Sequence, residues 1–110
     1  MNANFLIIKN MKLFVLSLND IVNVIPNRDR ILKDRLYITS YDILYYLNLV
    51  NYGNKNREYI NVILSNISML DFYLEVCLKN KYITSKLCER KCNELIKITK
   101  MIYGWIRSES

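Results

Sequence analysis

The sequence predicts an all-α protein, an up-down-up-down four-helix bundle formed by a single domain over residues 1–110. Apolar residues make up 52% of the chain, which is too many for a disordered protein. Two Gly and one Pro leave few turn positions, a composition that argues against a β-sandwich and favours long helices. Four stretches with helical apolar spacing, joined by short polar connections, account for the rest of the prediction.

The first expected helix covers residues 5–24. Its apolar residues at helical spacing are Phe5, Ile8, Met11, Val15, Leu18, Ile21 and Val22. Pro26 ends this helix, because the residue before a proline is disfavoured in the α region. Lys9, Lys12 and Asp20 interrupt the apolar run before the roughly 20 residues that a membrane span requires. We therefore expect a buried first helix and no membrane association.

The second expected helix runs over residues 30–51 and stops near Gly53. Its apolar stripe consists of Leu32, Leu36, Ile43, Leu47 and Val50. Tyr37, Tyr41 and Tyr45 repeat every four residues along the same helix. Such a ladder commonly packs in a core or a subunit interface, and the alternative is a set of rings on which bases stack.

The third expected helix, residues 55–79, is apolar on two sides. One seam holds Ile60, Ile63, Ile67, Leu70, Leu74 and Cys77. A second arc holds Val62, Met69, Phe72, Tyr73 and Val76. Four-helix bundles usually leave one face of each helix in water, so the second arc predicts self-association through its five residues. Burial of both sides within a monomer is the alternative.

The fourth expected helix, residues 85–107, has an apolar side and a basic side. Thr84 or Ser85 is its expected N-cap. The apolar side holds Cys88, Leu95, Ile102 and Ile106, flanked by Cys92 and Ile98. Gly104 lies on the basic side, and because Gly in a helix costs about 1 kcal/mol relative to Ala, it predicts a close backbone approach. Trp105 is expected to anchor helices or subunits and joins the predicted oligomer interface.

The positive charge of the chain predicts an anionic partner. A formal net charge of +6 suits a nucleic acid, an anionic membrane or an acidic protein. Residues 86–108 alone hold six Lys and Arg against two Glu. The residues expected to contact RNA or DNA are Arg28, Arg30, Lys33, Arg35, Lys86, Arg90, Lys97, Lys100 and Arg107. An ordinary solvated helix face is the alternative reading of the same cations.

No arrangement of residues indicates catalysis, so we expect a protein that is not an enzyme and that binds no cofactor and no metal. The chain has no His, which removes the usual general base and a common zinc ligand. Its acids are scattered, and no Gly-rich loop is present to hold phosphate. Cys77, Cys88 and Cys92 are an odd number without the spacing of a disulfide framework. Buried reduced thiols, and hence a cytoplasmic location, are the expectation.

Four short stretches occur in a distinctive order. IPNRDRILKDRL joins the first two helices, NYGNKNREYI joins the next two, a short turn precedes ITSKLCER, and MIYGWIRS lies near the end. In order and spacing, over about residues 18–108, these stretches resemble the accessory variability determinant (Avd) proteins of diversity-generating retroelements. The ending in particular is similar to that family's hydrophobic, Gly-Trp, aliphatic, basic sequence.

The resemblance implies a homopentameric barrel of four-helix protomers with a positively charged surface. Such an assembly binds nucleic acid and associates with the reverse transcriptase of the element. It supports complementary-DNA synthesis from the template RNA during mutagenic retrohoming and is not itself catalytic. The alternative is a structural oligomer or protein-interaction adaptor without nucleic-acid binding. That class includes the related four-helix proteins encoded in intervening sequences of ribosomal RNA genes.

The chain departs from the Avd pattern at four positions. Asp71 and Glu75 stand where the family has Arg, so this part of the surface is expected to repel phosphate. Tyr103 replaces the glycine that usually precedes Gly-Trp, and Lys97 replaces a customary acid. The Asn-Ile-x-Glu-Gly signature of the intervening-sequence proteins does not occur in the sequence, which favours the retroelement family.

Overall fold

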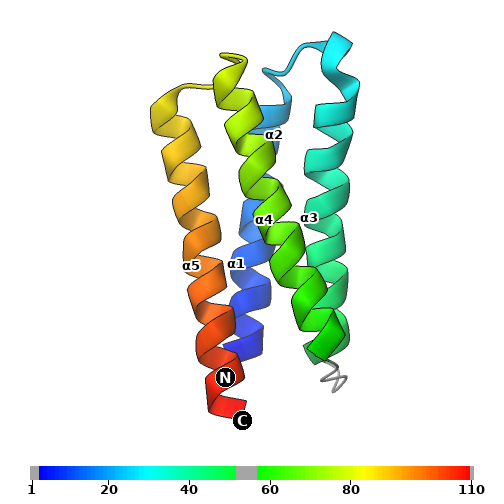
Figure 1. Cartoon of the computed structure of the whole chain (residues 1–110), viewed down its shortest axis with the longest axis vertical. Coiled ribbons are helices and arrows are strands. Elements are labelled where there is room, and N and C mark those ends of the chain that lie inside the picture. Colours follow the sequence, from blue (N-terminus) through cyan, green and yellow to red (C-terminus); the bar gives the residue numbers. More distant parts are fainter. Residues whose placement is uncertain (1–2, 52–56, 110) are drawn as a thin grey trace.

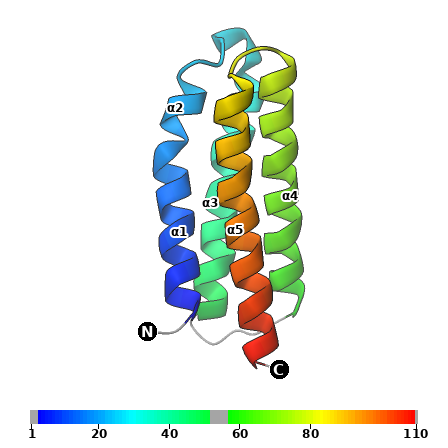
Figure 2. The same ribbon diagram turned by 90° about the vertical axis from the view of Figure 1, so that its left-hand side faces the viewer.

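Four long helices, each antiparallel to its neighbours, form the bundle in Figures 1 and 2. The computed structural model describes residues 3–51 and 57–109, and these residues contain no strand. The long helices are α1 (Ala3–Ser17), α3 (Arg30–Asn51), α4 (Arg57–Lys79) and α5 (Ser85–Glu109). The short elements are α2 (Asn19–Val22) and a 3-10 turn, η1 (Asn27–Asp29). The predicted all-α fold with four long helices is confirmed.

The four long helices occupy the corners of a square in cross-section. Both α1 and α4 pack against α3 and α5. Consequently α1 and α4 lie on one diagonal of the bundle, and α3 and α5 lie on the other. This arrangement decides which predicted surface residues share a face.

The predicted first helix, residues 5–24, is interrupted rather than continuous. α1 ends at Ser17, and the chain makes a turn at Leu18 before α2 begins. The Leu18 amide donates to the Val15 carbonyl at 3.1 Å, a bond over three residues instead of four. The Ser17 hydroxyl donates to the Phe14 carbonyl at 2.8 Å. Side-chain bonds of this kind compete with the backbone bonds of a helix, but the same bond from Ser40 to the Tyr37 carbonyl leaves α3 continuous, so it does not by itself account for the break.

The end of α4 shows why a chain with few glycines still turns sharply. Lys81 takes a left-handed conformation with φ of 62°. The Lys81 amide donates to the Leu78 carbonyl at 3.0 Å, and the Tyr82 amide donates to the Cys77 carbonyl at 2.9 Å. These two bonds are those of a Schellman ending, which satisfies the last carbonyls of a helix. A lysine therefore occupies a position where glycine is more usual.

Two other helix ends follow the sequence closely. Pro26 is extended, with ψ of 147°, and separates α2 from η1. Thr84 Oγ1 accepts a hydrogen bond from the Leu87 amide at 3.1 Å, so Thr84 is the cap of α5, one of the two predicted candidates. Gly53, the predicted stop of the second helix, lies outside the described residues.

The predicted apolar stripes form most of the core. The stripe predicted for the first helix is wrong in part: Phe5 is exposed and Val15 half-buried, whereas Ile7 and Phe14 are buried, because the core side of α1 is turned toward them. On α4 the buried residues are Ile60, Ile63, Ile67, Leu70, Leu74 and Cys77. On α3 the predicted residues Leu32, Leu36, Ile43, Leu47 and Val50 are all buried. On α5 the buried apolar residues are Cys88, Leu95, Ile98, Ile102 and Trp105, whereas Ile106 is half-buried. Burying each large aliphatic side chain contributes about 1.5–3 kcal/mol, so these stripes are the main source of stability.

α4 is also long and apolar enough to cross a membrane, by length and composition alone. Its most apolar 18-residue window has a mean hydropathy of 1.3, and a third of that window (33%) is buried inside the bundle. A core helix of a soluble bundle meets the same criterion. The buried seam of α4 accounts for one part of its apolar character, and the predicted second arc accounts for the other.

Candidate nucleic-acid interface

The outward side of α5 carries the predicted basic stripe. Lys86, Arg90, Lys97, Lys100 and Arg107 are all exposed. The stripe extends about 21 Å between the first and fourth of these residues, because an α-helix rises about 1.5 Å per residue. The structure therefore presents these five cations to solvent along one helix.

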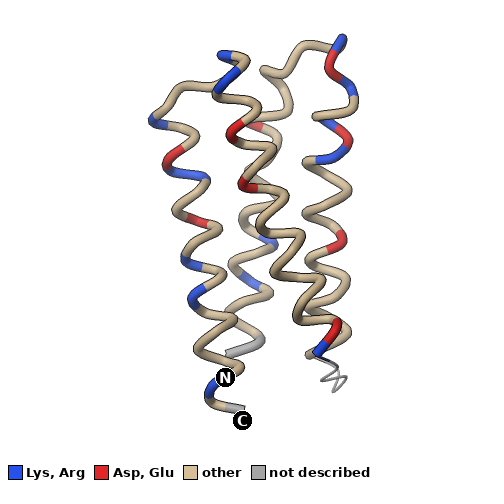
Figure 3. Tube along the Cα trace, viewed as in Figure 1, with Lys and Arg blue, Asp and Glu red and all other residues tan. Residues whose placement is uncertain are grey.

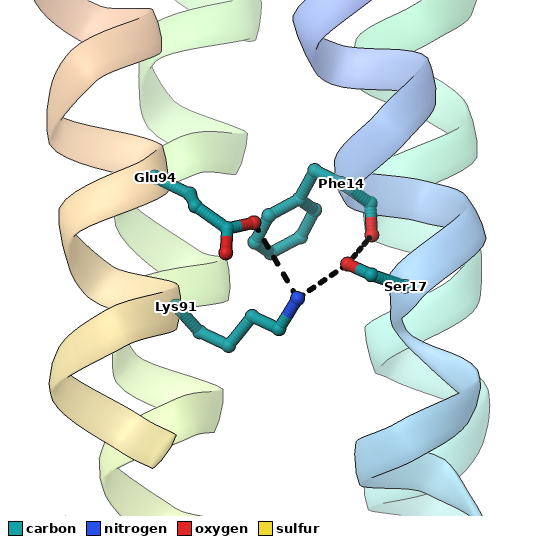
Figure 4. A network of polar contacts seen from close by, with 4 residues as sticks. All are labelled: Phe14, Ser17, Lys91 and Glu94. Atoms are coloured by element: carbon teal, nitrogen blue, oxygen red, sulfur yellow. Dashed lines mark hydrogen bonds and ion pairs between the residues drawn. The ribbon is translucent and has the colours of Figure 1, made fainter. Parts of the chain in front are cut away.

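Lys91 also belongs to α5 but points into the bundle, where it is 3% exposed. Its ammonium donates a hydrogen bond to the Ser17 hydroxyl of α1 and lies 3.4 Å from Glu94 Oε1, as Figure 4 shows. The same ammonium lies 5.8 Å from the centroid of the Phe14 ring, a favourable cation–π arrangement. Lys91 thus ties α5 to α1 and is not part of the basic surface, although the sequence counts it among the cations of residues 86–108.

The nine residues predicted to bind nucleic acid do not form a single face. Arg28, Arg30, Lys33 and Arg35 belong to η1 and the first turns of α3. The other five lie on α5, which is diagonal to α3. The two groups approach each other only at the end of the bundle where η1 and the α4–α5 turn meet, and positive residues gather there in Figure 3. The sequence alone could not show that the two groups lie on diagonally opposite helices, because the arrangement of helices in space is a property of the tertiary structure.

Two further cations, which are not among the nine predicted residues, lie at that end of the bundle. Lys79 is the last residue of α4, and Lys81 follows in the turn; both are exposed. The Tyr82 hydroxyl donates to Asp29 Oδ2 at 3.1 Å and joins this turn to η1. The sequence does contain an indication of this cluster. The run KNKY, residues 79–82, begins at the last residue of the apolar helix and continues into the turn.

A groove of about 490 Å³ separates the outward edges of α4 and α5. Its lining includes Leu64, Ile67, Ser68, Asp71, Leu95, Ile96, Thr99, Lys100 and Tyr103. Asp71 and Lys100 therefore line the same groove, and Asp71 brings a negative charge to the border between α4 and α5. Glu75, the other acid that departs from the Avd pattern, is exposed one turn further along α4.

The predicted oligomer interface on α4 is partly open to solvent. Met69 and Phe72 are exposed, and Phe72 reaches 53% exposure. The other three predicted residues of the arc, Val62, Tyr73 and Val76, are half-buried. Trp105 was predicted to belong to this interface, but its side chain is 6% exposed and packs within the protomer core. It follows Ile98 and Ile102 at helical spacing, so it falls on the core side of α5.

α1 and α3 carry apolar side chains that are more exposed than those of the predicted interface on α4. None of these side chains was predicted to belong to an interface. Leu16 on α1 is 71% exposed and Ile31 on α3 is 77% exposed. Leu13 and Ile38 are exposed on the same two helices. The sequence could have indicated them, because they are apolar residues that lie outside the predicted core stripes.

The tyrosine ladder of α3 does not lie in the core. Tyr41 and Tyr45 are exposed, and Tyr37 is half-buried. The Tyr37 hydroxyl donates to Asn19 Oδ1, and its ring stacks on the Tyr41 ring with centroids 5.9 Å apart. Loss of solvent around Tyr37 and the neighbouring Tyr41 hydroxyl raise the pKa of Tyr37. Two of the three rings are therefore accessible on the protomer surface.

Gly104 makes no close contact within the protomer. A Cβ atom added there would meet Arg107 Nη2 at 4.0 Å, an ordinary van der Waals distance. The predicted close backbone approach is therefore wrong for the protomer, because Gly104 lies on the outward side of α5 instead of against a neighbouring helix.

The cysteines are packed rather than reactive. Burial raises the pKa of Cys77 to about 11. Burial and the Asp71 carboxylate raise the pKa of Cys92 to about 12, so both thiols keep their protons near neutral pH. The Cys88 sulfur lies 4.0 Å from that of Cys92 and donates to the Leu74 carbonyl at 3.7 Å. Within residues 3–51 and 57–109, no group of three His, Cys, Asp or Glu side chains is placed to hold a metal ion.

Comparison with known proteins gives a likeness in fold. No protein-family model matches the chain, and no curated protein matches it at a significant level. A solved structure from Bacteroides thetaiotaomicron, a protein of unknown function from the S23 ribosomal protein family, matches with a TM-score of 0.82. The match covers 96% of this chain and 99% of that chain, at 14% sequence identity. The predicted Avd membership stays a prediction, and the chain is similar to this S23-family protein in its all-helical fold.

Proposed function

We propose that this protein is a non-catalytic nucleic-acid-binding protein that partners the reverse transcriptase of a diversity-generating retroelement. The observation that carries nucleic-acid binding is the basic stripe of α5, where Lys86, Arg90, Lys97 and Lys100 are all exposed. Phosphate contacts by such side chains release counterions from the nucleic acid, which gives affinity without reading the sequence. The partnership with a reverse transcriptase is supported by the resemblance of the helix connections and of the MIYGWIRS ending to the Avd family.

The direct test reverses two charges in the middle of the stripe. Lys97→Glu combined with Lys100→Glu is expected to weaken binding to single-stranded RNA at least tenfold, because phosphate contacts become repulsive. Fluorescence anisotropy with labelled RNA, across a series of salt concentrations, measures the effect. Lys9→Glu with Lys12→Glu is the matched control, since both lysines are exposed in the middle of α1.

Three results would contradict nucleic-acid binding. These are no binding of the unaltered protein to RNA or DNA at low salt, an affinity that does not fall with salt, and equal effects of the α5 and α1 double variants. The partnership with a reverse transcriptase has its own test. A reverse transcriptase gene and paired template and variable repeats are expected beside this gene, and the two proteins are expected to co-purify. A neighbourhood without them would overturn the partnership and leave RNA binding intact.

A second candidate function is a structural oligomer or interaction adaptor. The observation that favours it is the set of apolar side chains on outward faces of three helices, including Leu16, Ile31 and Phe72. Exposed apolar groups of this size are typical of surfaces that associate. Light scattering measures the number of subunits. This candidate predicts that the Lys97→Glu and Lys100→Glu variant assembles and binds its protein partners normally.

A further inference from the structure

The strongest concentration of positive charge lies at one end of the bundle. The segments 27–35 and 79–86 together hold seven Lys and Arg against two Asp, which is +5 of the chain's net +6. The first segment forms η1 and the start of α3, and the second forms the end of α4, the turn and the start of α5. Although they are far apart in the sequence, both lie at the same end of the bundle in Figure 3.

A side-chain hydrogen bond joins these two segments. The Tyr82 hydroxyl in the turn donates to Asp29 Oδ2 in η1 at 3.1 Å. The bond fixes the turn against η1 and engages one of the two acids of the region. Loss of solvent and this hydrogen bond raise the pKa of Tyr82, so the hydroxyl keeps the proton that it donates. The basic end is thus one surface held together by its own structure.

The cations of this end point outward from rigid backbone. Arg28, Arg30, Lys79 and Lys81 are all exposed. Lys81 is held by the two backbone bonds that end α4, so little conformational freedom of its backbone is lost on binding. The half-buried Lys33 donates to Asn27 Oδ1 at 2.8 Å, which leaves two ammonium protons for a ligand.

The α4–α5 turn offers charge but no apolar anchor. Tyr82 is half-buried and Ile83 is buried, so neither presents a large ring or aliphatic group for a protein partner to enclose. Protein interfaces draw most of their affinity from such anchors. A phosphate backbone needs none, because regularly spaced cations supply its affinity. Ile31 and Leu78 are exposed beside the turn, so it is the net charge of +5 at this end that favours a polyanion over an acidic protein.

We propose that this end of the bundle is a second phosphate-binding surface, built by Arg28, Arg30, Lys79 and Lys81, for the RNA or DNA strand that α5 contacts. The proposal rests on the proposed nucleic-acid binding and assigns Lys79 and Lys81 to it. Lys86 lies in the first turn of α5, next to the α4–α5 turn, so the end surface continues into the basic stripe. A strand crossing both surfaces turns from the end of the bundle onto the side of α5.

The test removes the two newly assigned charges without disturbing the turn. Lys79→Gln keeps helix propensity, and Lys81→Asn keeps a residue that tolerates the left-handed conformation. The matched control, Lys9→Gln with Lys12→Gln, removes the same charge from exposed positions of α1. Anisotropy with labelled single-stranded RNA is measured between about 50 and about 200 mM salt, and circular dichroism checks the fold of each full-length variant.

The turn variant is expected to bind RNA several-fold more weakly than the unaltered protein. The slope of log affinity against log salt is expected to fall by about 1.4, since each phosphate contact to a single strand contributes about 0.7. The control is expected to keep the slope. If the unaltered protein binds RNA and both variants keep its slope and affinity, the end surface is wrong and the proposed function survives. Equal losses in both variants would also overturn the end surface, and absence of binding by the unaltered protein would overturn both proposals.

Discussion

The two sides of α5 use the same residue type for opposite purposes. On the inward side, Lys91 is 3% exposed and bonds to Ser17 and Glu94. On the outward side, Lys97 and Lys100 are exposed, within about three helical turns of it. Desolvation makes the inward ammonium depend on its partners, whereas water solvates the outward ones. A charge therefore has to be located on a side of its helix before it is counted toward a binding surface.

The two residues of the Gly-Trp pair also lie on opposite sides of α5. Trp105 belongs to the inward side and fills the core, whereas Gly104 faces outward with open space beside it. Neighbours in a helical sequence point about 100° apart, so adjacent residues on the border between the two sides serve different surfaces. Three sets of variants test this division, beginning with the inward side.

The largest expected effect is that of Trp105→Ala. Truncating a large buried aromatic residue leaves a cavity, so the free energy of unfolding is expected to fall by about 3–5 kcal/mol. Chemical denaturation measures the loss. Tyr103→Ala, on the exposed side of α5, is the control and is expected to change stability little. A folded Trp105→Ala variant with unaltered stability but fewer subunits would show that Trp105 is an interface residue, as the sequence suggested.

Lys91 gives the next effect, and its sign depends on the replacement. Lys91→Ala removes the packed stem together with the ammonium and is expected to destabilise the fold by about 2 kcal/mol. Lys91→Met keeps the stem and removes the desolvation penalty, so its stability is expected to equal or exceed that of the unaltered protein. Ser17 stays satisfied in both variants through the Phe14 carbonyl.

Thermal and chemical denaturation of the two Lys91 variants measure this difference. Lys97→Ala and Lys97→Met serve as outward controls, and neither is expected to change stability measurably. If Lys91→Met proves as damaging as Lys91→Ala, the ammonium itself, and not its stem, stabilises the contact between α1 and α5.

The smallest effect is a gain from Gly104→Ala. A methyl group fits beside Arg107 Nη2, so the change is expected to stabilise the helix by about 0.4–1 kcal/mol. Asn93→Ala, on the exposed side of α5, is the control, because it also raises helix propensity. Melting temperature and subunit number are measured together. A loss of assembly in the Gly104 variant alone would show that a second copy approaches the backbone there.

Sequence reasoning predicted the elements of this fold closely and their spatial relations poorly. The bounds of α3 match the prediction, and the six buried residues of α4 are those of the predicted seam, because helical periodicity is a local property. The break at Leu18 escaped prediction. At this break the Ser17 hydroxyl bonds to the Phe14 carbonyl and accepts from Lys91, a contact across 74 positions of the chain that no local pattern indicates.

The candidate binding surface likewise has a part that the sequence predicted and a part that it did not. Exposure of Lys97 and Lys100 followed from the apolar stripe on the opposite side of α5. The addition of Lys79 and Lys81 did not follow, because it depends on the α4–α5 turn meeting η1 through Tyr82 and Asp29.

By itself, the sequence determined that this chain forms four long helices, which side of α3, α4 and α5 is apolar, and that the chain as a whole is basic. Those properties repeat every few residues and act within one element. Only the tertiary structure decided that α3 and α5 are diagonal, that Lys91 belongs to the core, that Trp105 packs within the protomer, and that the basic residues of two distant segments form one end of the bundle. Each of these depends on which helices pack together, and that choice reflects the burial of all apolar stripes at once rather than the pattern of any single helix.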